Sequence, residues 1–170
     1  KFMSFDHQAF SDSTSLDSVA SVNQLEQDRT LFVGAKYESY YQAQFEKITP
    51  KKQYAGFNIA AFFLGVVWLF YRKMYSYGFM SIGLIVVIGM VEIILGIESS
   101  GANIGLAVAF GMFGNTLYKY HVDQQIAKIH QLGSGSVHTE LENRGGTNIV
   151  AGSILLVIWL GLVALAISTS

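Results

Sequence analysis

Four long runs of uncharged, mostly apolar residues occupy the chain from Tyr54 onward, and they constrain its fold more than any other feature. They cover residues 54–71, 74–97, 99–118 and 148–170, and Glu92 is the one charged residue inside them. A membrane-spanning helix needs about 20 apolar residues. The last three runs are therefore long enough, while the first, with 18 residues, is borderline. The sequence predicts an all-α integral membrane protein with three transmembrane helices, the last placed over 148–168.

The composition agrees with a membrane protein and excludes several functions. Charged residues make up only 14% of the 170 residues, against about 25% in ordinary soluble domains. The 11 basic and 12 acidic residues give a net charge of −1, which provides no basic field for nucleic acid. Because the chain has no cysteine, disulfides, thiolate metal sites and thiol nucleophiles are excluded.

Residues 1–53 are more polar and form the predicted cytoplasmic region, ahead of a membrane domain over 54–170. A weak helix is predicted over 15–27, and an amphipathic helix over 31–48. The apolar side chains of the second helix form an aromatic stripe at helical spacing: Val33, Tyr37, Tyr40, Tyr41, Phe45 and Ile48. Pro50 ends this helix. We expect the stripe to be a face on which a partner docks.

The distribution of basic residues favours one topology, because Lys and Arg near membrane helices stay on the cytoplasmic side. If all four runs span, six basic residues lie on one side and five on the other. If 54–71 is instead interfacial or re-entrant, all eleven lie on one side, together with the connector 119–147. The second arrangement, with a cytoplasmic N-terminus, is favoured. The four-span alternative stays open.

The end of the first run is rich in aromatic and basic side chains: Trp68, Tyr71, Arg72, Lys73 and Tyr75. Amphipathic rings beside cations are typical of the membrane interface, where the cations contact lipid phosphates. The pattern predicts an interface anchor, and more narrowly a site for a lipid headgroup or a partner.

Small residues at four-residue spacing predict close helix packing. They occur in the first run as Ala61 and Gly65, and in the third run as two ridges: Gly101, Gly105 and Ala109 on one, and Ala107, Gly111 and Asn115 on the other. A helix lined on two sides in this way is expected to be central. We expect leucine at Gly105 or Gly111 to abolish association.

Glu92 is the one ionisable residue well inside a run, and an intramembrane carboxyl is a functional-site hypothesis by default. It lacks a basic partner within the runs. A contact with a partner subunit is therefore favoured over a proton or ion pathway.

Motifs for chemistry are missing from the sequence. It has no G-x-S-x-G, Walker-type or H-E-x-x-H string, and its four histidines lie outside the apolar runs. We therefore expect no enzyme activity, no cofactor and no metal.

Several blocks resemble the YigF-like family of small bacterial membrane proteins of unknown function. They are Phe32-Val33-Gly34, Tyr40-Tyr41, Phe45, the block from Phe57-Asn58 to Tyr71-Arg72-Lys73-Met74-Tyr75, Gly114-Asn115, Tyr118 and His121. The resemblance covers about residues 31–147. It implies a bacterial inner-membrane location and supplies no catalytic residue.

These patterns together predict a non-enzymatic accessory or assembly subunit of a larger inner-membrane complex. Its expected partners are the lipid bilayer and other membrane-protein subunits or a second copy, but not nucleic acid. The alternative is an oligomeric ion or proton pathway that uses Glu92.

Overall fold

The computed structural model describes residues 7–96, 101–133 and 135–168, and the described part of the chain is built from helices. They are α1 (His7–Val33), the π-helical turn η1 (Tyr37–Tyr41), α2 (Gln42–Lys47), α3 (Ile59–Leu64), α4 (Val66–Tyr71), α5 (Tyr75–Leu95), α6 (Gly101–Leu132), α7 (Val137–Arg144) and α8 (Ile149–Ser168).

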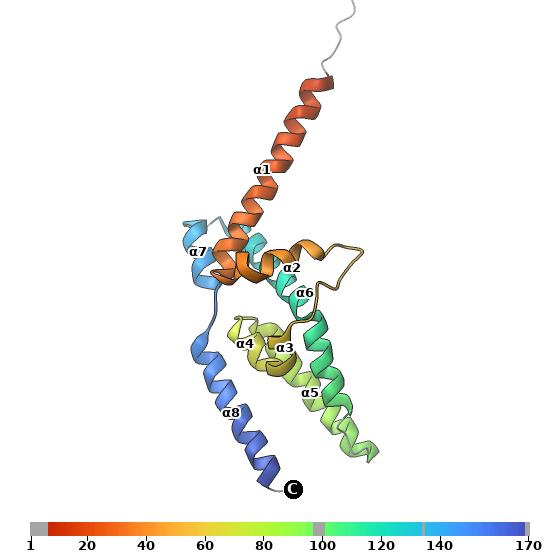
Figure 1. Ribbon diagram of the computed structural model, residues 1–170. Coiled ribbons are helices and arrows are strands. Elements are labelled where there is room, and N and C mark those ends of the chain that lie inside the picture. The colour runs from red at the N-terminus through yellow and green to blue at the C-terminus, as the bar shows by residue number, and fades with distance from the viewer. Residues whose placement is uncertain (1–6, 97–100, 134, 169–170) are drawn as a thin grey trace, which may run out of the picture.

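The helices divide into an upper cluster and a lower part (Figure 1). The end of α1, η1, α2, α7 and the second half of α6 form the cluster, while the amino-terminal part of α1 extends away from it. The helices α5 and α8 run downward from it, whereas the first half of α6 lies in the lower part and runs upward into the cluster. With 32 residues, α6 belongs to both parts. At 1.5 Å per residue it is about 48 Å long.

The amphipathic helix expected over 31–48 has different boundaries in the structure. Residues 31–33 are the end of α1, and α1 also includes the weak helix expected over 15–27. Gly34 then takes a φ of 76°, a conformation that costs glycine little, and interrupts the helix. The chain resumes as η1 and α2, and α2 ends at Lys47, before the turn that contains Pro50.

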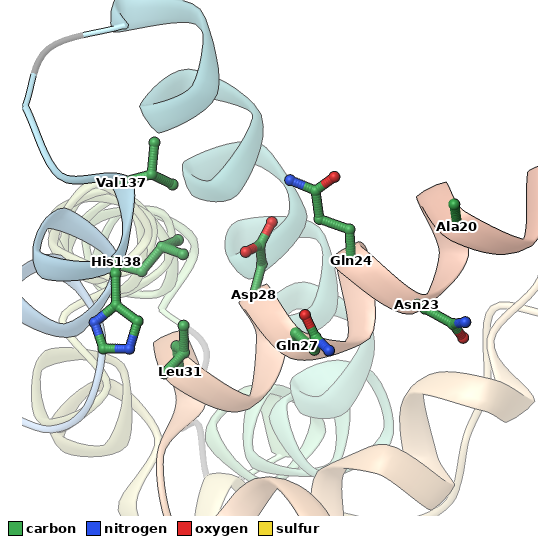
Figure 2. A pocket seen from close by; sticks show the side chains of 9 residues that line it. Ala20, Asn23, Gln24, Gln27, Asp28, Leu31, Val137 and His138 are labelled. Carbon is green, nitrogen blue, oxygen red and sulfur yellow. The ribbon is translucent and has the colours of Figure 1, made fainter. Parts of the chain in front are cut away.

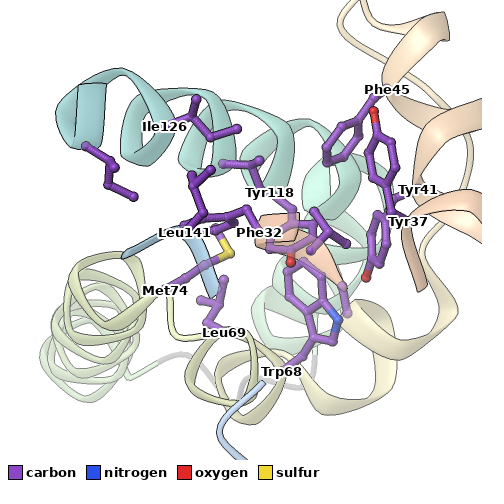
Figure 3. Close-up of a cluster of buried hydrophobic side chains, with 14 of the residues drawn as sticks. Phe32, Tyr37, Tyr41, Phe45, Trp68, Leu69, Met74, Tyr118, Ile126 and Leu141 are labelled. Carbon is purple, nitrogen blue, oxygen red and sulfur yellow. The ribbon is translucent and has the colours of Figure 1, made fainter. Parts of the chain in front are cut away.

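The aromatic stripe lies in the core of the upper cluster, so its interpretation as a docking face is wrong. Tyr37, Tyr41 and Phe45 are at most 3% exposed. They pack against Tyr118 of α6 and Trp68 of α4, and the core continues through Phe32, Leu69, Met74, Ile126 and Leu141 (Figure 3). Burial of this apolar face against α4 and α6 holds the cluster together.

The first apolar run, 54–71, does not form one helix. It contains two six-residue helices, α3 and α4, separated at Gly65, whose φ is 46° and ψ is −113°. Each is about 9 Å long at the helical rise. The ends of the run both return to α6: the Thr116 hydroxyl donates to the carbonyl of Gln53, and Arg72 contacts the Tyr118 hydroxyl. Both ends of the segment are therefore linked to α6, the start through Thr116 and the end through the side chain of Tyr118.

Among the described residues, two stretches are long and apolar enough to cross a membrane, whereas three were expected. One is α5, and the other lies within Val137–Leu165, whose apolar part is α8; each has a mean hydropathy of 2.4 over its best window. Residues 101–118 of the third run form the first half of α6 and do not reach this apolarity, while residues 99 and 100 of the run lie outside the described part of the chain. Asn103, Asn115 and Thr116 interrupt its apolar residues, and its glycines add little hydropathy.

Candidate functional site

The candidate site is the layer where the upper cluster meets the lower helices. At this level Asn148 precedes α8 and donates from its backbone to the carbonyl of Tyr71 over 2.8 Å. Its side chain donates to the Tyr75 hydroxyl at the start of α5, also over 2.8 Å. The Asn148 Oδ1 accepts from the backbone of Ala151 over 3.0 Å, so this residue also caps α8. The starts of α5 and α8 are thereby tied together.

A buried amide pair joins α3 to α6 in this layer. Asn58 donates from Nδ2 to Oδ1 of Asn115 over 2.9 Å, and its own Oδ1 caps α3 by accepting from the backbone of Ala61 over 2.9 Å. Asn115 donates to the Tyr40 hydroxyl and to the carbonyl of Gly56, each over 3.3 Å. These groups satisfy one another's hydrogen bonds in the buried interior, where a lost partner costs more than at a surface.

Arg72 is buried between aromatic rings. Its guanidinium carbon lies 4.7 Å from the ring centre of Tyr41, 5.0 Å from that of Tyr118 and 5.7 Å from that of Tyr71. Within the described residues it forms no ion pair, and its Nε has no hydrogen-bond partner. Burial raises the pKa of the Tyr41 hydroxyl, although the neighbouring cation of Arg72 opposes part of that rise. The cation is held by ring faces.

The five residues of the expected interface anchor lie in different environments. Trp68 is 2% exposed and Arg72 is 6% exposed, so both belong to the interior of the layer. Tyr71 and Lys73 are half-buried, and Lys73 donates to the carbonyl of Asn143 over 3.0 Å. Tyr75 is exposed.

One of the two small-residue ridges of α6 is used inside the chain. Asn115 is fully buried, and the Phe57 ring lies directly on the backbone of Gly111. Ala61 packs on Gly114, where an added Cβ would lie 2.7 Å from the alanine methyl. Gly114 was not among the predicted packing residues, although it follows Gly111 by three positions and so shares its face. Leucine at Gly111 would displace Phe57.

The other ridge is open. No heavy atom of the described chain lies within 4 Å of a Cβ built on Gly101 or Gly105, and Ala109 is half-buried. Gly65, which was paired with Ala61 in the sequence, instead marks the break between α3 and α4, where an added Cβ would lie 3.5 Å from the Phe110 ring.

An apolar groove of about 590 Å³ lies between the broken segment and the lower helices. Its lining comes from α3, α4, α5, α6 and α8 and is apolar apart from Asn103 and the indole N–H of Trp159. On α6 the lining residues Asn103 and Ala107 lie opposite Gly105, at about 160° around the helix by its 100° step per residue. The groove and the open ridge are therefore separate surfaces of α6.

Glu92 lies far from this layer. It is half-buried on α5, 17 positions after Tyr75, which is about 26 Å along the helix. Within the described chain it forms no ion pair and no hydrogen bond through its carboxylate.

A charged network fastens α1 to α6 above the layer, and sequence reasoning missed it. Arg29 donates from Nε and Nη2 to the two carboxylate oxygens of Asp123, each over 2.8 Å, and from Nη1 to Glu26 over 2.6 Å. The Tyr37 hydroxyl donates to Glu26 over 2.5 Å, and burial raises its pKa. Arg29 and Asp123 are 94 positions apart, so no local sequence pattern predicts that they pair.

A depression of about 530 Å³ lies between α1 and α7 (Figure 2). Gln24, Gln27 and Asp28 line it from α1, opposite His138 of α7. The Asp28 carboxylate is already bound to His130 of α6, at 2.7 Å. Among the described residues no group of three or more His, Cys, Asp or Glu side chains is placed to hold a metal.

Comparison with known proteins places the chain in a family but supplies no activity. Neither the curated proteins nor the solved structures gave a match. The family described as "Protein of unknown function (DUF2628)" matches residues 21–124, which is more than half of the 170 residues. The expectation of a family without a known function is confirmed, whereas the YigF-like name has no support, and the match ends before residues 125–147. The chain belongs to the DUF2628 family.

Proposed function

We propose that the chain is a non-enzymatic, multi-pass protein of the bacterial inner membrane that acts as an accessory or assembly subunit of a larger complex. In this proposal the upper cluster is cytoplasmic, and the lower helices lie in the bilayer. The partners are lipid and other membrane-embedded subunits or a second copy of the chain.

The geometry supports three passages through the membrane. The starts of α5 and α8 are joined through Asn148, and both helices run away from that point in the same direction (Figure 1). If both cross the bilayer, the chain has to return between them, and α6 is the helix that returns. Its polar residues are then sheltered in part: Asn115 and Thr116 are buried against the segment 53–58.

The charges support the orientation. All eleven Lys and Arg residues lie outside 75–118 and 148–168. Both ends of the broken segment 54–71 contact α6, at Thr116 and at the side chain of Tyr118, which supports a location of the basic residues before and after it on one side of the membrane. Under the positive-inside rule, the side of the upper cluster is cytoplasmic.

The open ridge of Gly101 and Gly105 carries the proposal of association. A Cβ on either glycine would meet no described residue within 4 Å, whereas Gly111 and Asn115 of the second ridge are covered by Phe57 and Asn58. In each of the two apolar stretches only 6% of the best window is buried. In a bilayer, exposed small residues allow the backbone of another helix to approach closely.

A leucine scan of open glycines tests this proposal. Gly105→Leu is compared with Gly83→Leu on α5 and Gly161→Leu on α8, because all three glycines have open space around them. Each full-length variant is extracted from its native membrane in mild detergent, and the particle mass and its co-purifying subunits are determined. We expect Gly105→Leu alone to reduce the particle to the single chain. Equal particle mass in all variants would contradict association through this ridge.

The pathway through Glu92 is tested in the same preparation. Reconstituted protein is assayed for proton and ion flux, with Glu92→Gln as the matched variant. Flux that depends on Glu92, from particles containing this chain alone, would replace the subunit proposal.

A further inference from the structure

The turn between α2 and α3 presents exposed lysines. Thr49 and Lys52 exchange backbone hydrogen bonds of 2.9 and 3.0 Å, which places Pro50 and Lys51 at the tip. Lys51 and Lys52 are exposed, as is Lys47 just before the turn.

These lysines are not neutralised by the chain. Residues 42–57 contain three lysines and one acidic residue, Glu46. No ion pair joins Lys47, Lys51 or Lys52 to a described residue. The turn therefore exposes an excess of positive charge.

Two exposed aromatic side chains follow the lysines. Tyr54 is 43% exposed and Phe57 is 42% exposed. The turn is held at its upper end by α6, where Tyr120 donates to the Gln53 side chain over 3.0 Å and Thr116 binds the Gln53 carbonyl. Lower down, Asn58 donates from its backbone to the carbonyl of Gly111 over 2.7 Å.

This spacing matches the profile of a bilayer surface. Thr116 and Gly111 are five residues apart on α6, which is about 7–8 Å along the helix. The headgroup region on each face of a bilayer is about 5–7 Å thick. When Phe57 lies at the edge of the hydrocarbon, Lys51 and Lys52 lie among the phosphates and Tyr54 lies between them, as in an aromatic belt.

We propose that residues 49–57, here termed the lysine–aromatic turn, bind the headgroups of anionic phospholipids on the cytoplasmic face. The inference rests on the membrane location proposed above. It assigns headgroup contact to a segment different from 68–75, where Trp68 and Arg72 are buried.

Lipid binding is measured by native mass spectrometry of the full chain. The protein is released from micelles that contain equal amounts of phosphatidylglycerol and phosphatidylcholine. Lys51→Gln, Lys52→Gln and their combination are compared with Lys51→Arg/Lys52→Arg, which keeps the charge, and with Lys128→Gln on an exposed part of α6 well above the layer. Soluble glycerol phosphate serves as a competitor, and Tyr54→Ser tests the aromatic contribution.

The wild-type chain is expected to prefer phosphatidylglycerol, with affinity falling about fivefold for each lysine removed. The arginine variant and Lys128→Gln should retain the preference, Tyr54→Ser should weaken it, and glycerol phosphate should not displace the lipid. Equal preference in the double glutamine variant, or displacement by glycerol phosphate, would overturn the inference. Carbonate extraction of the same membranes separates the two proposals: a chain released by carbonate contradicts the membrane location itself, whereas a retained chain without lipid preference contradicts only the turn.

Discussion

Asn58 and Asn115 form a buried amide–amide hydrogen bond of 2.9 Å between the first apolar run and α6. They are 3% and 0% exposed. Together with the Thr116–Gln53 contact, this bond holds the start of the broken segment against α6. It is therefore central to the re-entrant geometry proposed for residues 54–71.

Asn115→Leu is expected to lower the free energy of unfolding by about 1–3 kcal/mol, because it leaves the buried amide of Asn58 without its acceptor. Unfolding of the purified chain in mixed micelles by added SDS measures the change. Asn103→Leu is the matched control, since Asn103 is exposed and forms no side-chain hydrogen bond in the described chain. An equal loss of stability in both variants would show that the Asn58–Asn115 hydrogen bond does not contribute to stability.

Gly114→Ala is expected to destabilise the chain by about 1–3 kcal/mol through overpacking. The added methyl would lie 2.7 Å from the methyl of Ala61, so α3 has to move away from α6. Gly105→Ala, in open space, should leave stability unchanged or slightly raised. The combination Gly114→Ala/Ala61→Gly should recover much of the lost stability. If it does not, the destabilisation does not come from the contact between residues 61 and 114.

Arg72→Lys is expected to cost about 2 kcal/mol, because an ammonium does not reproduce the stacking of a planar guanidinium on desolvated rings. The ring centres of Tyr41 and Tyr118 lie 4.7 and 5.0 Å from the guanidinium carbon. Arg144→Lys, on the exposed end of α7, is the control and should change stability little. Unchanged stability in Arg72→Lys would mean that the positive charge at this position stabilises the chain, and not the planar shape of the guanidinium.

His121 should make the chain less stable in acid. Burial, with a smaller effect of Lys128, lowers the pKa of His121 from 6.5 to about 4. The unfolded chain therefore binds a proton first, so stability is full above pH 6.5 and falls as the pH drops from 6.5 towards 4. The loss has an upper bound of about 3 kcal/mol. When the free energy of unfolding is measured against pH, His121→Phe should remove the fall between pH 6.5 and 4. His138→Phe, at an exposed site, should leave that fall unchanged.

Much of the secondary structure follows from the sequence. The long apolar runs predict α5 and α8 within two residues at their starts, and the glycine–serine stretch after Leu132 coincides with the end of α6. These features are local, because helix length and breaks depend on neighbouring residues. The lack of charge in the third run predicts a membrane-spanning helix. This criterion neglects the low hydropathy of the glycines and asparagines in the run.

The tertiary roles were harder to predict. An aromatic stripe such as Tyr37, Tyr41 and Phe45 looks the same in sequence whether it packs on its own chain or on a partner. Gly65 likewise does not predict the helix break between α3 and α4, because glycine also occurs inside membrane helices at close contacts. The Arg29–Asp123 pair and the burial of Arg72 depend on residues distant in the sequence.

The central claim is that both ends of 54–71 lie on the cytoplasmic side while α5 crosses the membrane. The cysteine-free chain allows a direct test with single cysteines at three exposed positions: Ser39 in η1, Ser76 at the start of α5 and Leu95 at its end. A membrane-impermeant maleimide is applied to intact cells and to permeabilised cells.

We expect Leu95→Cys to be labelled in intact cells, and Ser39→Cys and Ser76→Cys to be labelled only after permeabilisation. Labelling of Ser76→Cys in intact cells, with Ser39→Cys still protected, would mean that 54–71 crosses the membrane and would contradict the account.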